Sequence, residues 1–521
     1  MAVSKIYSAQ ATLLSAQIID LEVDLSRGLH SFSIVGLGDK SVDEAKDRVS
    51  SAIKNSGWKS PKNKNQKVVV SLAPANVKKE GPIFDLPIAL AYLIASEDIK
   101  AETEKRLFIG ELSLDGKLRP VSGVLPITQK AKKAGFKEIF LPIENAEEAA
   151  NIEGIDVYGV ESLLELVRHI NTKEIPDDLP AQAGNFSKKE IPIFQKNKVE
   201  HKRREVEIDF ADIKGQESAK RGLEIAAAGG HNIIMFGPPG TGKTMLAKAF
   251  SHLLPDLSFD EKLEVTSIYS IGGILEDGIV NEPPFRSPHH TASYVSLVGG
   301  GQNLKPGEVT LAHKGVLFMD EFPEFDKKVL ESLRQPLEDR VVTVSRAKGS
   351  VRYPAHFILV ATMNPCPCGN YGVKGKECIC SAISIEKYKR KLSGPIMDRI
   401  DLWVEVSKVE YEKLTDDRDL HEGTDKIKPR VEKARSIQEK RFLKLKIKTN
   451  AELSSKDLVK MVPLSDSTKE LLNTSAKQLD LSARSYHRII KLARTIADLE
   501  GVDEVEDKHI LEALQYRPKK Y

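Results

Sequence analysis

Cysteines and long apolar runs are scarce in this chain. All four cysteines of its 521 residues lie between Cys366 and Cys380, so no disulfide framework spans the sequence. The first 17 residues lack the basic start and apolar centre of a secretory signal. The most apolar later run, residues 83–95, contains Asp85 and is too short to cross a bilayer. We therefore expect a cytoplasmic protein with no membrane partner.

A net charge of one sign is also lacking. Lys and Arg number 78 and Asp and Glu 75, which leaves a formal charge of +3. Bulk charge therefore favours neither nucleic acid nor any other polyanion, and a basic surface must be local. A hydrophobic fraction of 40% and a charged fraction of 29% are those of a soluble globular protein. The length predicts roughly three domains.

The chain does have one glycine-rich segment that follows an apolar run at 232–236 and opens into helical spacing at 245–250. Strand, glycine loop and helix in this order are the context in which such a segment binds nucleotide phosphates. A plain glycine turn before a helix is the alternative, and the complete motif favours phosphate binding. The predicted nucleotide-binding residues are Gly237, Pro238, Pro239, Gly240, Thr241, Gly242, Lys243 and Thr244.

An acidic pair follows a second apolar run, residues 316–319. We expect Lys243 to reach the β- and γ-phosphates and the Thr244 hydroxyl to ligate Mg²⁺. Asp320 is placed to hold Mg²⁺ through water, and Glu321 to polarise the attacking water. The pattern predicts an enzyme that hydrolyses ATP with Mg²⁺ as cofactor.

Further segments resemble those of AAA+ ATPases. Asn364, after the apolar run 357–362, resembles the sensor-1 residue, whose amide contacts the γ-phosphate or orients the water. Arg399 in residues 394–402 resembles the arginine finger of the helix-2-insert clade, which acts on the ATP of the neighbouring subunit. The resemblance implies a homo-oligomeric ring, with a hexamer as the expected size. On spacing alone, an Asp-Arg pair more often forms a salt bridge.

Two insertions fit the same clade. Residues 268–293 stand where helix 2 would otherwise continue, and contain His289 and His290. We expect these histidines to have no carboxylate partner nearby and to hydrogen-bond without binding a metal. Residues 341–353 alternate on both sides of a Lys-Gly tip, which predicts a hairpin.

In a ring of this clade that hairpin is expected to point into the central channel. Its cations, Arg346, Lys348 and Arg352, would form a basic collar suited to a DNA backbone. A solvated hairpin tip is the alternative.

The cysteines directly follow Asn364. Cys366, Cys368, Cys378 and Cys380 lie within fifteen residues. Four thiolates at close range suit a tetrahedral structural Zn²⁺, whereas four reduced thiols are the alternative. Because a closed four-sulfur site leaves no open position, the metal would be structural and not catalytic.

Residues 1–171 predict an α+β domain, in which residues 31–35 return along the strand at 12–25. The other predicted elements are strands at 67–72 and 138–142, a hairpin at 111–118, and helices at 43–55, 83–95 and 128–134.

Two segments of this domain resemble the proteolytic domain of Lon-type proteases. Residues 79–85 resemble the nucleophile segment, and residues 110–136 the segment that carries the catalytic lysine. Ile83 stands at the serine position of that family and Leu125 at the lysine position. A Ser–Lys dyad needs a hydroxyl and an amine. The resemblance therefore implies a Lon-like fold of the ribosomal S5 domain 2 type without peptidase activity.

Three more regions complete the chain. Residues 172–205 predict a polar linker, for which contact with an anionic polymer is the alternative, and residues 206–408 the AAA+ core. Residues 409–521 predict a helical lid of the magnesium-chelatase type with helices at 430–442, 467–479, 483–499 and 507–516. Arg484 resembles the sensor-2 residue, which binds phosphate as the lid closes. We expect Arg488 and Arg494 to be surface or interface charges.

Over nearly its whole length the chain is identified as a member of the ComM/YifB family of magnesium-chelatase-like bacterial ATPases. The resemblance implies an α/β multidomain DNA helicase that drives branch migration in natural transformation or recombination, acting on single-stranded or branched DNA. The residues themselves indicate an ATP-hydrolysing ring-former. The alternatives are a magnesium-chelatase ATPase subunit that remodels a metallation partner, and a chaperone-like protein remodeller.

Overall fold

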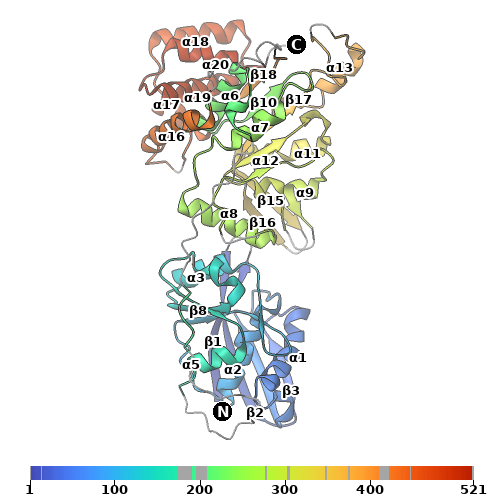
Figure 1. Cartoon of the computed structure of the whole chain (residues 1–521), viewed down its shortest axis with the longest axis vertical. Helices are drawn as coiled ribbons and strands as arrows, with labels where there is room; N and C mark the ends of the chain where they lie inside the picture. Colours follow the sequence, from blue (N-terminus) through green and yellow to red (C-terminus); the bar gives the residue numbers. More distant parts are fainter. Residues whose placement is uncertain are drawn as a thin grey trace. The chain divides into compact units, whose positions relative to one another are not determined.

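The computed structural model of the protein divides into two compact units, Met1–His201 with Lys262–Val280, and Lys202–Glu261 with Asn281–Tyr521 (Figure 1). The structure describes residues 2–12, 15–172, 190–194, 208–275, 279–301, 305–346, 349–373, 376–409, 422–445 and 447–518. Most of the predicted linker, 172–205, lies outside these residues. No described helix is long and apolar enough to cross a membrane. The prediction of a mixed α/β, multidomain protein with a parallel-sheet core is confirmed.

The first unit is built on a seven-stranded mixed sheet. In spatial order its strands are β3 (Ser31–Val35), β4 (Gln66–Ala73), β2 (Ser15–Arg27), β1 (Ala2–Thr12), β5 (Arg106–Phe108), β8 (Glu138–Pro142) and β9 (Asp156–Val160). β1 and β2 form a long antiparallel hairpin with Ala2 opposite Leu25. The predicted strands at 67–72 and 138–142 are confirmed.

The predicted pairing of residues 31–35 is wrong. β3 does not return along β2 but pairs in parallel with β4, with Phe32 opposite Val68. β4 lies between them and pairs antiparallel with β2. The reason is burial: β4 buries Val68, Val70 and Leu72, whereas no residue of β3 is fully buried, which suits β3 to the edge of the sheet.

Helices cover this sheet. They are α1 (Lys40–Asn55), α2 (Asp85–Ala95), α3 (Val124–Lys133), α4 (Ala146–Ala149) and α5 (Leu163–Ile170). Asp39 caps the start of α1, where its carboxylate accepts the N–H of Val42. The predicted hairpin at 111–118 is present as β6 (Glu111–Leu112) and β7 (Leu118–Arg119), with Gly116 at φ +89° in its turn.

Most of α8 (Phe259–Gly272) also belongs to the first unit, because the segment Lys262–Val280 is part of it. The Ser270 hydroxyl donates to Glu148 at 3.0 Å and accepts the N–H of Gly123 at 3.2 Å. A segment that follows the phosphate loop in the chain thus packs with residues of the first domain, which no local pattern in the sequence indicates.

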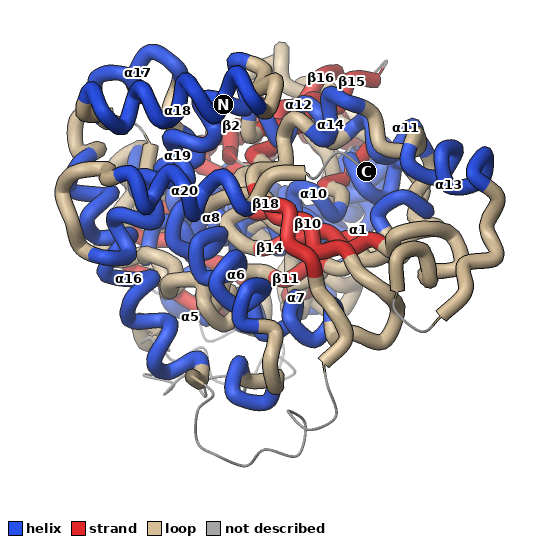
Figure 2. The backbone as a smooth tube through the Cα atoms, turned by 90° about the horizontal axis from the view of Figure 1, so that it is seen from above, coloured by secondary structure: helices blue, strands red, loops and turns tan. Residues whose placement is uncertain are grey.

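The second unit contains a five-stranded parallel sheet. Its order is β11 (Phe285–Arg286), β14 (Val316–Met319), β17 (Ile358–Met363), β10 (Ile233–Phe236) and β18 (Leu402–Glu405). Every residue of β10 and β14 is buried, as their apolar sequences predict. Because all neighbouring pairs are parallel, the carboxyl ends of the strands meet at one edge. Figure 2 shows this sheet with α6 (Glu217–Gly229) and α7 (Lys243–Ser251) beside β10.

Short elements surround this core. They are α9 (Tyr294–Val298), β12 (Gly299–Gly300), β13 (Lys305–Pro306), α10 (Glu308–Leu311), α11 (Lys327–Ser332), α12 (Arg334–Asp339), α13 (Ala382–Lys389) and α14 (Gly394–Met397). The hairpin predicted at 341–353 is confirmed as β15 (Val341–Arg346) paired antiparallel with β16 (Gly349–Pro354).

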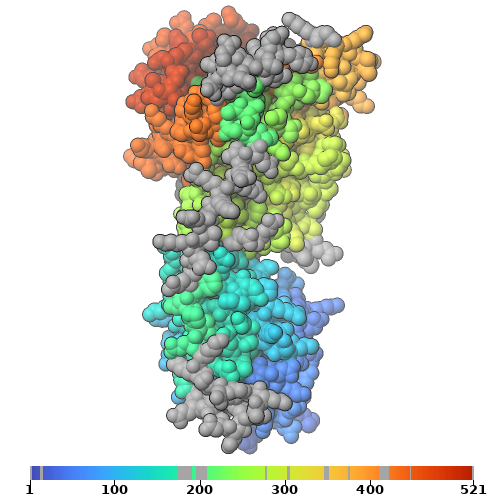
Figure 3. All heavy atoms as spheres, viewed as in Figure 1, coloured from blue at the N-terminus to red at the C-terminus, as the bar shows by residue number. Residues whose placement is uncertain are grey.

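The lid consists of α16 (Thr424–Arg441), α17 (Ser455–Met461), α18 (Asp466–Gln478), α19 (Ala483–Glu500) and α20 (Asp507–Gln515). α18, α19 and α20 match their predicted ranges within two residues. α16 begins six residues before its predicted start at 430 and contains Pro429. Gln438 donates to the carbonyl of Ala228 on α6 at 3.0 Å. Lid and core are thus one compact unit, seen in Figure 3 as orange and red atoms adjoining green.

Candidate nucleotide-binding site

The phosphate loop, residues 237–244, follows β10 at the carboxyl edge of the sheet. A Cβ at Gly237 would stand 2.1 Å from the carbonyl oxygen of Val406, so only glycine fits. Gly240 and Gly242 have φ of +77° and +86°, and no atom of the described residues lies within 4 Å of where a Cβ would stand. The loop therefore offers a face without side chains on which backbone N–H groups can meet phosphate oxygens, next to the start of α7.

Lys243 is the first residue of α7. Its ammonium donates to the carbonyls of Gly237 at 2.7 Å and Pro238 at 2.8 Å, and to Oδ1 of Asn364 at 3.3 Å. Burial lowers the pKa of Lys243, and the carboxylates of Asp320 and Glu321 oppose that shift. The structure thus brings the predicted phosphate-binding amine and the predicted sensor-1 amide together.

Thr244 and Asp320 lie in contact. The Thr244 hydroxyl donates to Oδ2 of Asp320 at 3.1 Å. A hydroxyl and a carboxylate beside a phosphate loop are hard oxygen ligands of the kind that Mg²⁺ prefers. The side chains present therefore fit a bound Mg²⁺.

Sequence reasoning missed Thr362, which ties the acidic pair together. Its buried hydroxyl donates to Oδ1 of Asp320 and accepts the backbone N–H of Glu321 at 3.2 Å. A buried hydroxyl costs free energy unless it is hydrogen-bonded. A threonine at the end of an otherwise apolar strand was the available signal.

Glu321 has a left-handed backbone, φ 52° and ψ 46°, and a half-exposed side chain. Nδ1 of His290 lies 3.6 Å from its carboxylate, so the expectation that neither histidine has a carboxylate partner is wrong. The parallel pairing of β11 with β14 brings the two segments together. His289 does hydrogen-bond as expected, to the hydroxyl of Thr291 at 2.8 Å.

Arg399 lies at the opposite edge of the same sheet. Asn232, directly before β10, donates its side-chain amide to the carbonyl of Arg399 at 2.9 Å, and its own carbonyl accepts the N–H of Asp401. The four residues of β10 separate this edge from Gly237 by about 13 Å. The Arg399 guanidinium donates to the carbonyl of Pro395 at 2.6 Å.

Glu338 on α12 connects the two predicted phosphate-binding arginines. One oxygen of its carboxylate accepts a hydrogen bond from the guanidinium of Arg399. The guanidinium of Arg484 lies 3.8 Å from the other carboxylate oxygen. Burial lowers the pKa of Arg399, and repulsion from Arg484 adds to the shift. Among the described residues, Arg484 is thus grouped with Arg399 and not with Lys243.

The expectation that Arg494 is a surface or interface charge is wrong. Its side chain is buried, and it bonds Asp498 at 2.9 Å together with the carbonyls of Val502 and Asp503 at 2.5 Å. Arg488 is largely buried at the boundary of core and lid, where it donates to the carbonyl of Ile400 at 2.6 Å. Helical periodicity alone did not reveal that the lid buries these cations against carboxylates.

The four cysteine sulfurs form a cluster. All lie within 4.8 Å of one another, and three of them are separated by 3.4, 3.6 and 3.7 Å. A tetrahedron of sulfurs around Zn²⁺ with bonds of about 2.3 Å has edges of about 3.8 Å. The donor set therefore fits a structural Zn²⁺.

The hairpin cations are only partly described. Arg352 is exposed on β16, opposite Thr343 and between the buried Val351 and Tyr353. Lys348 and the side chain of Arg346 lie outside the described residues.

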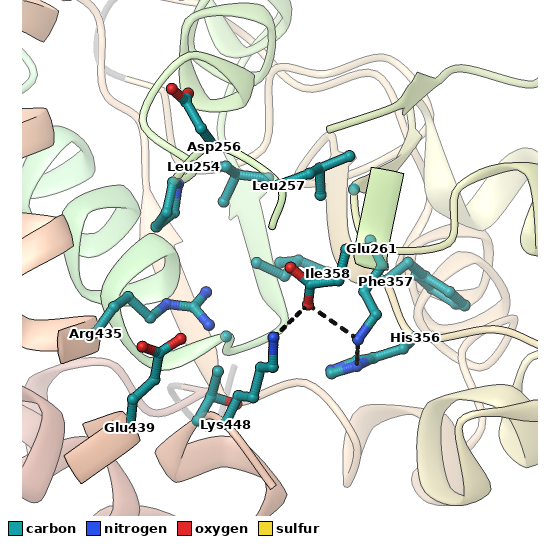
Figure 4. A pocket seen from close by; sticks show the side chains of 15 residues that line it. Leu254, Asp256, Leu257, Glu261, His356, Phe357, Ile358, Arg435, Glu439 and Lys448 are labelled. Carbon is teal, nitrogen blue, oxygen red and sulfur yellow. Dashed lines mark hydrogen bonds and ion pairs between the residues drawn. The ribbon is translucent and has the colours of Figure 1, made fainter. Parts of the chain in front are cut away.

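A cavity of about 120 Å³ lies in the second unit, lined by the amino ends of β14 and β17 and by the lid, and so apart from the phosphate loop (Figure 4). Glu261 accepts from Lys448 at 2.9 Å and lies 3.4 Å from Lys314, which in turn contacts His356. Burial raises the pKa of Glu261, but these two lysines prevail and lower it to about 2. Within the cavity, the charges of Glu261, Lys314 and Lys448 thus compensate one another.

The chain matches three family models in succession. Residues 21–145 match "Subunit ChlI of Mg-chelatase", residues 209–414 match "Magnesium chelatase, subunit ChlI", and residues 421–517 match "Magnesium chelatase, subunit ChlI C-terminal". The "Competence protein ComM" of Haemophilus influenzae is 41% identical over 519 residues, which cover 99% of this chain and 98% of that protein.

The chain belongs to the ComM/YifB family. YifB of Escherichia coli is 40% identical over 521 residues, 99% of this chain and 97% of that protein. The "Magnesium-chelatase 67 kDa subunit" of Chlorobaculum parvum matches over 165 residues only, 32% identical and 30% of this chain. Membership of this magnesium-chelatase-like family makes the protein an AAA+ ATPase, with ATP and Mg²⁺ as the expected nucleotide and ion. Members of ComM/YifB thus share the whole length of the chain, whereas this chelatase subunit shares a part.

Proposed function

We propose that the protein is a ring-forming ATPase, expected to be a hexamer, that moves DNA during transformation or recombination. The observation that carries the proposal is the division of the nucleotide machinery between two edges of one sheet. Lys243, Asp320 and Glu321 follow the carboxyl ends of the strands, whereas Arg399 lies beyond the amino end of β10. A chain with both halves at opposite edges can complete the site only with a neighbour in a head-to-tail assembly, of which a closed ring is the finite form.

Within one chain the residues divide the work of hydrolysis. The phosphate loop and Lys243 bind the phosphates, and Thr244 with Asp320 holds Mg²⁺, which neutralises phosphate charge when bound. Glu321 takes the proton of the attacking water, and Asn364 orients that water.

Between chains, Arg399 stabilises the charge on the phosphates of the neighbour, and Arg484 acts beside it. The sequence predicts only that Arg484 binds phosphate as the lid closes, and the pairing with Glu338 places it beside Arg399. Glu338 holds both arginines in the single chain, and phosphates of the neighbouring subunit replace its carboxylate in the ring.

The first domain supplies no catalysis in this proposal. Ile83 and Leu125 are buried aliphatic residues of the hydrophobic core, and neither can act as a nucleophile or a base. We infer a Lon-like fold that has no peptidase activity. The cysteine cluster holds a structural Zn²⁺.

The DNA part of the proposal rests on the relative named as a competence protein and on the β15–β16 hairpin. One face of the hairpin is buried through Val342, Val344 and Val351, and Arg352 stands on the other. Repeated around a ring, Arg346, Lys348 and Arg352 would bind a phosphate backbone through charge.

The test compares ATPase activity with branched DNA, with magnesium-chelatase partner subunits and with unfolded protein. The proposal predicts stimulation and strand displacement with DNA alone. Stimulation by one of the other two instead would favour the chelatase or the chaperone alternative.

A paired variant examines the hairpin. Arg346→Ala with Lys348→Ala should weaken DNA binding, lower its salt dependence and abolish strand displacement. Thr343→Ala, in the same hairpin and without a charge change, is the control. If the double variant displaces strands at the parent rate, Arg346 and Lys348 are not the residues that bind DNA during movement.

A further inference from the structure

The chain between Asn364 and Tyr388 leaves the nucleotide site and returns to it. At its start, the side-chain oxygen of Asn364 accepts a hydrogen bond from the ammonium of Lys243. The cysteine loop, residues 366–380, follows, and α13 then brings the buried Tyr388 back to the same place. Burial raises the pKa of Tyr388, and a hydrogen bond from the backbone of Asn364 acts against that rise. The returning end of the segment therefore contacts Asn364, the predicted sensor residue at which the segment begins.

The first turn of the cysteine loop lies directly on the phosphate loop. The N–H of Gly369 donates to the carbonyl of Cys366 at 2.9 Å, which closes a tight turn. A Cβ at Gly369 would stand 2.5 Å from Cδ of Pro239 and 3.0 Å from its Cγ. Real Cβ atoms do not approach a carbon so closely, because dispersion attraction gives way to repulsion below about 3.5 Å. Even one methyl group at this position would displace Pro239.

The thiols set the shape of that turn. Sγ of Cys366 accepts the N–H of Tyr371 at 3.3 Å and lies 3.4 Å from Sγ of Cys368. Cys378, from the returning half of the loop, lies 3.7 Å from Cys366. A metal held by all four cysteines would join the turn on Pro239 to the segment that leads to Tyr388.

We propose that the cysteine loop is a metal-dependent support of the nucleotide site, in which Gly369 positions Pro239 and the segment's ends position Asn364. With the metal bound, the phosphate loop keeps the shape that binds ATP, and loss of the metal weakens ATP binding. The inference rests on the structural Zn²⁺ of the proposed function and is independent of DNA. It makes Gly369 a positioning residue.

Two glycines of the same loop provide a matched pair. Gly369 and Gly372 have φ of +78° and +74°, so alanine is similarly strained at both. Among the described residues, no atom lies within 4 Å of a Cβ at Gly372, whereas a Cβ at Gly369 meets Pro239. Gly369→Ala should weaken ATP binding about tenfold or more, since misplacement by about 1 Å is costly at a binding site. Gly372→Ala should bind ATP as the parent does, with equal zinc content and thermal midpoint in both variants.

A double variant shows whether the Pro239 contact is the cause. Pro239→Ala removes the two ring carbons that the Gly369→Ala methyl would meet. If the inference holds, the double variant binds ATP as well as Pro239→Ala alone, because the clash has gone. Additive losses, or equal affinities of Gly369→Ala and Gly372→Ala, would overturn the positioning role.

The metal is tested separately by equilibrium binding of a fluorescent ATP analogue, which needs no turnover. Two samples should lose affinity for the analogue: the Cys378→Ser variant, and parent protein stripped with a zinc-selective chelator while Mg²⁺ is held constant. Added zinc should restore the affinity of the stripped parent but not that of Cys378→Ser. Equal affinity of zinc-loaded and stripped protein would overturn the inference while the zinc site stands. If protein purified in reduced form and without chelator carries no zinc, the metal-dependent part of the proposal is overturned. The comparison of Gly369→Ala with Gly372→Ala would still test the contact between Gly369 and Pro239.

Discussion

The two edges of the parallel sheet in the second unit differ in what holds their functional side chains. At the carboxyl edge, Thr244 and Asp320 contact each other, and Lys243 contacts Asn364. At the amino edge, Arg399 has no phosphate-loop partner among the described residues and pairs with a glutamate. The first edge is a nearly complete site, and the second carries cations whose partner is a carboxylate that phosphate can replace.

This difference indicates how the protein can require assembly before turnover. In the proposed ring each chain would contribute one half to each of two sites, and strand β10 separates these halves by its own length. Variants at the two edges should therefore fail in different ways, and the failures should be separable by measuring binding and turnover independently.

Loss of the amino-edge arginine should have the largest effect on turnover. Arg399→Ala should reduce kcat about a thousandfold or more, because an arginine finger stabilises charge that develops in the transition state. ATP affinity of the single chain should stay near that of the parent. Arg390→Ala, an exposed arginine paired with Glu386, is the control in steady-state ATPase assays. A comparable loss of ATP binding in Arg399→Ala would contradict the separation of the edges.

At the carboxyl edge, Glu321→Gln should lower kcat by about 10² to 10³ while ATP still binds, because only proton abstraction is lost. Glu324→Gln, three residues later and paired with Lys391, is the control. Single-turnover hydrolysis and ATP binding measured on the same protein distinguish the steps. Parent-like turnover would remove Glu321 from its assigned role.

At the same carboxyl edge, Lys243→Ala should impair the binding of ATP. Removing a charged donor to phosphate should weaken ATP binding about a hundredfold. Lys248→Ala on the same helix, outside the phosphate loop, is the control. Calorimetric titration with ATP and Mg²⁺ checks the result, and unchanged affinity would contradict the phosphate-binding role.

The smallest expected effect concerns the contact that occupies the amino edge. Glu338→Gln removes the carboxylate that competes with the phosphates of the neighbour, so ATPase per chain at low protein concentration should rise about two- to threefold. Asp339→Asn, the exposed adjacent residue, should behave as the parent. A loss of activity would mean that Glu338 orients the arginines and does not compete for them.

The sequence located the carboxyl edge better than the amino edge for a physical reason. Glycines that must adopt positive φ, and acids that end a buried strand, leave local signals at Gly240, Gly242 and Asp320. Glu338 and His290 leave none, because strand pairing and helix packing bring them to Arg399 and Glu321.

The sequence also did not predict which strands pair when they are not consecutive in the chain. The strands β2, β3 and β4 have clear patterns, yet their order depends on which of them has most to bury. Likewise the cysteine spacing suggests a metal, but it does not reveal that Gly369 touches Pro239.

Mixing two inactive variants tests the shared site most directly. Lys243→Ala and Arg399→Ala proteins are combined in equal amounts under conditions in which mixed rings are shown to form. A site between one chain's intact Lys243 and the next chain's intact Arg399 should then arise at about a quarter of the interfaces, because the contacts around a ring are heterologous. The account predicts that ATPase activity returns toward that fraction of the parent rate. Mixed rings with no activity above the sum of the separate variants would contradict it.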